Sequence, residues 1–247
     1  MKQSAFPHVS SRGLHVAIVT DDDHHKAQPW SLRQYWGHPR GSAFVSSVVK
    51  TAMSLGIDTL TLCSLSSDNW ECSATGTDIG PSMKCFLDNL HAELAAPPDG
   101  DICIQVIGRR DRFPPQILDR IEKLQDVGKG THGLTLRLAF DYSSRQMLIE
   151  ALRHAAVNIP LDKSGHPTLG SFLGQAMNTG QSSPDVDLMI RTGGEYWLGD
   201  SLLWESAYAE LFFTPKKWPD FTDKDLAEAI REFHGRERRF GNLVLAS

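Results

Sequence analysis

"LHVAIVT", residues 14–20, is an unbroken apolar run that ends at three consecutive aspartates, Asp21 to Asp23. A short apolar run bounded by charge is typical of a strand that is buried on both faces of a sheet. Like charges placed this close repel one another, so the carboxylates need either solvent or a bound cation. The stretch therefore predicts a central strand whose carboxyl end opens into an acidic loop, either solvated or metal-binding.

Strand-like and helix-like segments alternate along the rest of the chain. Four more apolar runs have the length of buried strands, at 59–65, 101–108, 134–142 and 187–191. Between and after them, the apolar spacing is that of helices, at 41–56, 81–95, 114–127, 144–158 and 222–240. Such alternation implies a mostly parallel sheet covered by helices on both faces. We therefore predict an α/β fold.

Composition limits the classes of function. The formal net charge of −5 over 247 residues argues against general binding to nucleic acid or anionic membranes. Residues 1–12 contain no apolar segment suited to a signal peptide, and no apolar stretch reaches the roughly 18 residues of a membrane helix. The four cysteines form no Cys-x-x-Cys pair, which favours reduced thiols. We expect a cytoplasmic protein with a flexible N-terminus at 1–12 and one domain at 13–247.

Polar side chains follow every predicted strand at the end where ligands collect in parallel sheets. Arginines, carboxylates and small hydroxyls stand at 21–25, 66–70, 109–112, 141–145 and 191–195. Guanidinium groups suit phosphate oxygens and carboxylates suit Mg²⁺, so this edge predicts a metal and diphosphate site. The absence of G-x-G-x-x-G and G-x-x-x-x-G-K-[ST] argues against ordinary dinucleotide or ATP binding.

Simpler interpretations remain open for some of these groups. The aspartate loop is compatible with solvent alone, and the arginines of 109–112 are equally compatible with a loop of ion pairs around Asp111. His24 and His25 lack the further ligands of a zinc site. Glu210 lies in an apolar segment whose aromatic residues we expect in the core, namely Trp204, Tyr208, Phe212 and Phe213. A carboxylate there needs a partner, and a metal would serve.

The C-terminal third carries several motifs that occur together and in order. These are IRTGGE (190–195), LLWESAYAELFF (202–213), WPDF (218–221) and RERRFG (236–241). With GHPRG (37–41), SLSSDNW (64–70), IGRRDRFPP (107–115) and LAFDYSSR (138–145), the chain resembles the cis-prenyltransferase, or undecaprenyl diphosphate synthase, family. The resemblance implies a six-stranded, mostly parallel sheet flanked by helices, a homodimer, a hydrophobic cleft for the prenyl chain, and Mg²⁺ as cofactor.

The resemblance also implies roles for individual residues. Asp21 corresponds to the aspartate that holds Mg²⁺ at the allylic diphosphate, and Glu210 to a second metal-linked carboxylate. Other positions implied to act in catalysis or in substrate binding are His38, Asp68, Asn69, Trp70, Arg33, Arg191 and Glu195. Arg239 and Gly241 correspond to the C-terminal R-x-G that reaches across the dimer to bind diphosphate.

Several positions depart from the family pattern. After the first strand the family usually reads D-G-N-G-R-W-A, whereas residues 21–27 read DDDHHKA, with His25 in place of the arginine. Cys72 stands where another phosphate-binding arginine is common. After IRTGGE, the usual arginine and serine of the acceptor site are Trp197 and Gly199. Each lost charge-assisted contact costs about 1.5–3 kcal/mol of binding free energy.

These departures favour the irregular branch of the family. The predicted reaction joins dimethylallyl or geranyl diphosphate to a second allylic C5 diphosphate, giving a short branched or cyclised prenyl diphosphate. His24, His25, Asp22 and Asp23 are candidate bases, and the Trp197 indole is a candidate to steady the tertiary cation or, alternatively, a packing residue. The alternatives are head-to-tail condensation with isopentenyl diphosphate, or a non-catalytic accessory subunit.

Overall fold

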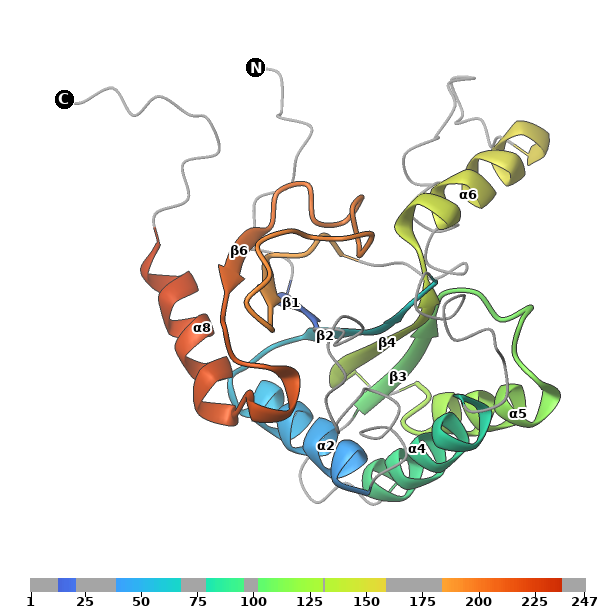
Figure 1. Ribbon diagram of the computed structural model, residues 1–247, viewed down its shortest axis with the longest axis horizontal. Helices are drawn as coiled ribbons and strands as arrows, with labels where there is room; N and C mark the ends of the chain where they lie inside the picture. Colours follow the sequence, from blue (N-terminus) through green and yellow to red (C-terminus); the bar gives the residue numbers. More distant parts are fainter. Residues whose placement is uncertain are drawn as a thin grey trace.

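The computed structural model describes residues 13–20, 39–67, 79–95, 102–130, 132–158 and 184–236. These residues build one six-stranded sheet in the order β3-β4-β2-β1-β5-β6 (Figure 1). The strands are β1 (His15–Val19), β2 (Thr59–Ser66), β3 (Ile102–Ile107), β4 (Leu134–Tyr142), β5 (Leu188–Arg191) and β6 (Glu210–Phe213). Every neighbouring pair is parallel, which confirms the predicted sheet.

Helices connect the strands and cover the sheet. They are α2 (Pro39–Ser54), α4 (Ile79–Leu94), α5 (Pro115–Asp126), α6 (Ser144–Asn158) and α8 (Asp223–Gly235), with a short 3₁₀ turn at Trp218–Asp220. Figure 1 shows α2, α4 and α5 side by side below the sheet, whereas α6 leads away on its other side. The predicted helices are present within a few residues of their expected bounds. Residues 237–240 of the last predicted helix lie outside the described ranges, as does the predicted N-terminus at 1–12.

The two faces of the sheet differ in chemistry. The face toward α2, α4, α5 and α8 is packed with apolar side chains from alternate strand residues such as Ile18, Leu62 and Leu136. The other face has smaller side chains, including Ala17 and Ala139, and is packed by Met147 and Ala151 of α6. Because side chains alternate along a strand, the continuous apolar runs of the sequence place residues on both faces. The larger apolar core lies on the helix-rich face, the one covered by α2, α4, α5 and α8.

The segment between β5 and β6 corrects one prediction. Trp204 and Tyr208, expected in the core, are 44% and 62% exposed. Residues 201–208 form turns and no helix, so Trp204 and Tyr208 lie on the surface of the chain, whereas Leu202, Glu205 and Ser206 are buried. Phe212 and Phe213 are half-buried in β6. The two aromatic side chains that the apolar spacing placed in the core therefore lie on the surface of the single chain.

Two further expectations concern the thiols and the membrane. Cys63, Cys85 and Cys103 are free thiols, as predicted, whereas Cys72 lies outside the described residues. Within the described ranges, no helix combines the length and the apolar character needed to cross a membrane.

Gly108, just after β3, marks a close approach of two strands. Its φ is +108°, and a Cβ at this position would lie 2.1 Å from the Phe140 carbonyl oxygen of β4. Only glycine therefore lets the loop after β3 turn against the end of β4. Gly56, between α2 and β2, has a φ of +70° and open space around its missing Cβ.

We predict that Gly108→Ala destabilises the protein more than Gly56→Ala does. Backbone strain alone should cost about 1–2 kcal/mol in either variant. The clash with the Phe140 carbonyl should add roughly 1–3 kcal/mol to the Gly108 variant alone. Urea unfolding of both variants would measure the difference, and equal losses of stability would contradict the clash.

Candidate active site

The carboxyl ends of the parallel strands gather arginines and carboxylates on one edge of the sheet, as the sequence predicted. Val19 and Arg191 stand at the same level, because β1 and β5 pair in register. Ile107, the last residue of β3, is likewise paired with Ala139, three residues before the end of β4. The described part of this edge comprises Thr20, Ser67, residues 108–112, residues 141–145 and residues 191–200.

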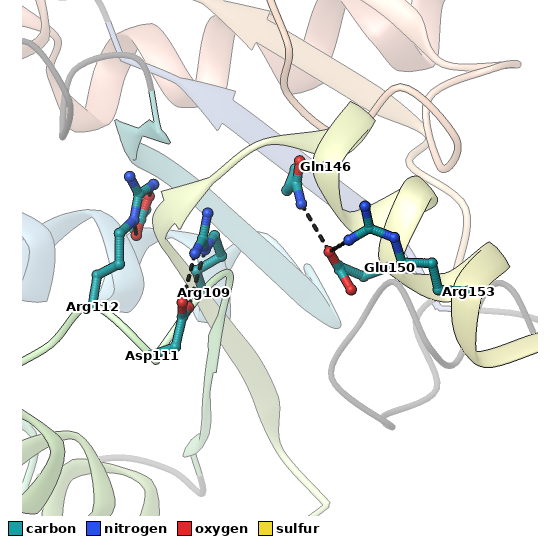
Figure 2. A network of polar contacts seen from close by, with 7 residues as sticks. Arg109, Asp111, Arg112, Gln146, Glu150 and Arg153 are labelled. Atoms are coloured by element: carbon teal, nitrogen blue, oxygen red, sulfur yellow. Dashed lines mark hydrogen bonds and ion pairs between the residues drawn. The ribbon is translucent and has the colours of Figure 1, made fainter.

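The arginines after β3 are engaged with neighbouring groups. Arg109 makes an exposed two-point ion pair with Asp111, with a closest N–O distance of 2.5 Å (Figure 2). Arg110 donates to the Val106 carbonyl and to Gln125. The ion-pair interpretation of this loop is thus right for Arg109 and Asp111, and this contact holds the pKa of Asp111 below its usual value.

Arg112 and Asp141 join the ends of β3 and β4. The guanidinium of Arg112 donates to both carboxylate oxygens of Asp141, at 2.8 and 2.5 Å. Asp141 is fully buried, and its φ of +48° is uncommon for a residue with a Cβ. Its carbonyl also accepts from the Arg109 amide. Such strain persists only where the surroundings enforce it, so the ion pair fixes the shape of this edge.

Arg191, the last residue of β5, lies under an indole ring. Its side chain is buried, and its guanidinium carbon is 4.7 Å from the ring centroid of Trp197. Trp197 donates its Nε1 proton to the carboxylate of Glu195 and is itself 56% exposed. The ring therefore separates Arg191 from solvent on one side. Sequence reasoning singled out all three residues, and the structure brings them together.

Gly199 accommodates the indole. It has a φ of +67°, and a Cβ there would lie 2.9 Å from Cζ3 of Trp197. A side chain at this position is thus disfavoured both by the backbone and by the ring. The two departures from the family pattern, at positions 197 and 199, are thus linked, because the indole lies where a Cβ at 199 would meet it.

The loop that carries Trp197 is anchored at both ends. Gly193 and Gly194 donate their amides to the carbonyls of Lys216 and Thr214 beyond β6. At the other end, Asp200 accepts from the Ser143 hydroxyl at 2.5 Å and from the Arg145 amide at 3.0 Å. A carboxylate there satisfies an amide in the first turn of α6 and complements the helix dipole. Sequence reasoning missed Asp200, because its partners lie 55 or more residues away.

Glu210 lies at the opposite end of the sheet from Arg191. It is level with Leu188 at the start of β5, three residues or about 10 Å of strand before the level of Arg191. Its carboxylate pairs with Arg236 at 3.3 Å, and Arg236 also binds the Leu211 carbonyl. The expected partner of this carboxylate is thus present as a cation, so neutralising it does not require a metal.

Twelve of the predicted site residues lie outside the described ranges. They are Asp21, Asp22, Asp23, His24, His25, Arg33, His38, Asp68, Asn69, Trp70, Arg239 and Gly241. Their roles stay predictions. Within the described ranges, no group of three or more His, Cys, Asp or Glu side chains is placed to hold a metal ion.

The small-residue face of the sheet contains buried ionisable groups that sequence reasoning missed. Arg137 of β4 and Glu205 are almost fully buried, and burial lowers the pKa of Arg137. Burial raises the pKa of Cys63 to about 12 and lowers that of His15 to about 3. Cys63 therefore stays a thiol and His15 stays neutral, with its ring nitrogens bonded to Thr61 and the Pro184 carbonyl. These groups support the fold and offer no nucleophile.

Comparison with known proteins agrees with this architecture. Residues 20–241 match the prenyltransferase family model described as "Putative undecaprenyl diphosphate synthase". The chain belongs to this family. It is therefore a prenyltransferase, and the resemblance seen in the motifs is confirmed at the level of the family.

Individual relatives cover nearly the whole chain. An isoprenyl transferase of Rhodopirellula baltica is 39% identical over 93% of both chains. The ditrans,polycis-undecaprenyl-diphosphate synthase of Escherichia coli is 34% identical over 92% of this prenyltransferase and 89% of its own length. Among solved structures, lavandulyl diphosphate synthase from Lavandula x intermedia, in complex with dimethylallyl diphosphate, has a TM-score of 0.78. It is 29% identical and covers 93% of this chain and 98% of its own.

We predict that Asp200→Ala lowers the free energy of unfolding by about 1 kcal/mol, because α6 loses a capping carboxylate. Prenyl transfer should fall with it, since the loop over Arg191 loses one anchor. The matched control is Asp126→Ala, which removes a 68% exposed carboxylate paired with Lys129 and should change stability by under about 0.5 kcal/mol. Thermal unfolding and turnover of both variants test this, and an Asp200 variant that behaves like the Asp126 variant would refute the anchor.

Proposed function

We propose that this prenyltransferase condenses dimethylallyl or geranyl diphosphate with a second allylic C5 diphosphate, giving a short branched or cyclised prenyl diphosphate. The observation that carries the proposal is the indole of Trp197 over Arg191. By resemblance, Arg191 serves the acceptor diphosphate, and an arginine at 197 would normally help it. Here that position offers an aromatic face and one N–H donor, already directed to Glu195. An acceptor bound at Arg191 therefore lacks the usual second guanidinium.

The proposed chemistry proceeds by ionisation. The C–O bond of the donor breaks and releases diphosphate, and the allylic cation forms a C–C bond with the internal alkene carbon of the acceptor. The tertiary cation that results loses a proton to a base or closes a ring first. Asp22, Asp23, His24 and His25 are the proposed bases. The similarity to a lavandulyl diphosphate synthase bound to dimethylallyl diphosphate supports this assignment.

Head-to-tail condensation with isopentenyl diphosphate is the second candidate. It is favoured by the relatives named isoprenyl transferase and undecaprenyl-diphosphate synthase, which are 39% and 34% identical over nearly the whole chain. This alternative requires isopentenyl diphosphate to bind without the arginine and serine replaced by Trp197 and Gly199. The two candidates differ in the C5 substrate that they consume.

Mg²⁺ is proposed as the cofactor, with Asp21 as its ligand. When bound, it would stabilise the negative charge that develops on the leaving diphosphate. Glu210 does not fit as a ligand at the edge that holds Arg191, because it lies at the other end of β6 and is paired with Arg236. Any role of Glu210 toward the metal therefore requires a different arrangement, such as a second subunit.

A homodimer is the proposed assembly, in the cytoplasm. Exposed apolar side chains support it, because α6 presents Ile149 and Leu152, which are 45% and 46% exposed. The segment between β5 and β6 adds Trp204 and Tyr208. Apolar groups of this kind are typical of surfaces that a second subunit covers. The proposed crossing residue is Arg239 of the C-terminal R-x-G.

We predict that purified enzyme with Mg²⁺ and dimethylallyl diphosphate alone forms a C10 product with a branched or cyclic skeleton. The reason is that the proposed acceptor is itself allylic. Mass spectrometry of the dephosphorylated alcohols identifies the skeleton, and EDTA should stop product formation until Mg²⁺ is restored. Turnover only when isopentenyl diphosphate is supplied, with linear products, would establish the head-to-tail alternative instead.

We also predict that two inactive variants restore each other. Asp21→Ala should lose the metal ligand, and Arg239→Ala the diphosphate contact supplied across the dimer. Mixed after subunit exchange, they should regain up to about a quarter of wild-type turnover per total site, because one hybrid site in each heterodimer keeps both groups. Mixing two preparations of Asp21→Ala is the control. If exchange is verified and no activity returns, each site is built within one chain.

A further inference from the structure

Arg191, Trp197 and Gly199 lie together at the carboxyl end of β5. The guanidinium of Arg191 is buried at the carboxyl edge of β5, and the indole lies over it at 4.7 Å. A cation over an indole face is attracted by the ring's quadrupole. The ring itself is more than half exposed, so no core packing holds it there. What holds it is the attraction to Arg191, the Nε1 contact to Glu195 and the space left by Gly199.

We infer that Trp197 is a specificity-determining cover of Arg191, which an acceptor diphosphate must displace, and that Gly199 is the positioning residue that lets the cover close. The inference rests on the proposed assignment of Arg191 to the acceptor diphosphate. The indole occupies one side of the Arg191 guanidinium, so a diphosphate that approaches from that side competes with the ring. Any acceptor that binds Arg191 must break the indole contact and so loses binding free energy. The loss weakens binding most for acceptors that are held by their diphosphate alone.

The role of Gly199 follows from its geometry. A Cβ added there would lie 2.9 Å from Cζ3 of Trp197, closer than Cβ atoms approach their neighbours. The indole is the far end of a rotatable side chain, so it gives way before the backbone does. A residue with a Cβ at 199 therefore shifts the indole from its observed place over Arg191. The positions act as a pair, and their effects on diphosphate binding should not be additive.

The experiment is calorimetric titration of the purified full chain with inorganic diphosphate in EDTA, which suppresses any metal-assisted site. Trp197→Ala should bind diphosphate about two- to thirtyfold more tightly than wild type, the range that corresponds to the loss of one cation–π contact. Trp197→Phe keeps an aromatic face and should stay near wild type. Tyr196→Ala is the matched control, because Tyr196 is 77% exposed and its ring lies at a tilt against Phe213 instead of over Arg191. An Ala variant at 197 that binds no more tightly than wild type overturns the inference.

Gly199→Ala provides a second route that leaves the indole in the chain. It should tighten diphosphate binding in the wild-type background and have no effect in the Trp197→Ala background. The backbone strain at the positive φ is the same in both backgrounds, so the difference isolates the contact with the ring. Equal effects in the two backgrounds would show that Gly199 does not act through Trp197.

Arg191→Ala separates this inference from the function on which it rests. If diphosphate binding is unchanged in Arg191→Ala, the assignment of Arg191 to the diphosphate fails, whatever Trp197 does. If Arg191→Ala weakens binding but Trp197→Ala does not strengthen it, the cover alone is refuted. Both results are obtained without turnover, so the skeleton of the product does not enter the decision.

Discussion

The parallel register of the six strands is the constraint on which the site depends. Because β1, β5 and β6 pair in one direction, Val19, Arg191 and Phe213 end at the same level. Groups that follow the strands are thereby brought to one edge, although they are far apart along the chain. The same register places Glu210 at the other edge, where it meets Arg236 of α8. The parallel register thus places the candidate anion-binding groups at one edge of the sheet and Glu210 at the other.

Local pattern was sufficient to predict the sheet and its helices, because burial on both faces requires continuous apolar runs. It was insufficient for contacts that depend on tertiary structure. Asp141 was expected at the carboxyl edge, but its partner Arg112 stands 29 residues earlier, and the hydroxyl that binds Asp200 stands 57 residues earlier. The prediction that Trp204 and Tyr208 lie in the core was wrong for a related reason. Apolar spacing predicts that a side chain is buried, but it does not indicate whether the burial occurs within the same chain or against another one.

The two faces of the sheet differ in the polar and ionisable side chains that they bury. The helix-rich face is free of polar side chains among its buried strand residues, whereas the other face buries His15, Thr61 and Arg137. Burying a guanidinium is costly unless an opposite charge is near, and Glu205 provides that charge. Histidine and thiol on the same face are kept uncharged by desolvation. The ionisable residues of this face are therefore part of its packing.

The acceptor loop shows why two departures from a family pattern need to be considered together. The indole at 197 occupies its observed place over Arg191 with a glycine at 199, where a Cβ would lie 2.9 Å from the ring and force one of the two to shift. A glycine at 199 without the indole would merely remove a hydroxyl from the acceptor site. By resemblance, the two changes together replace two diphosphate contacts by an aromatic surface that lies over the guanidinium of Arg191. A site that had lost its function would not be expected to keep Arg191 buried, cap it with a ring and anchor the loop through Asp200 to α6. The geometry supports the proposal of an anion site whose access has been made selective.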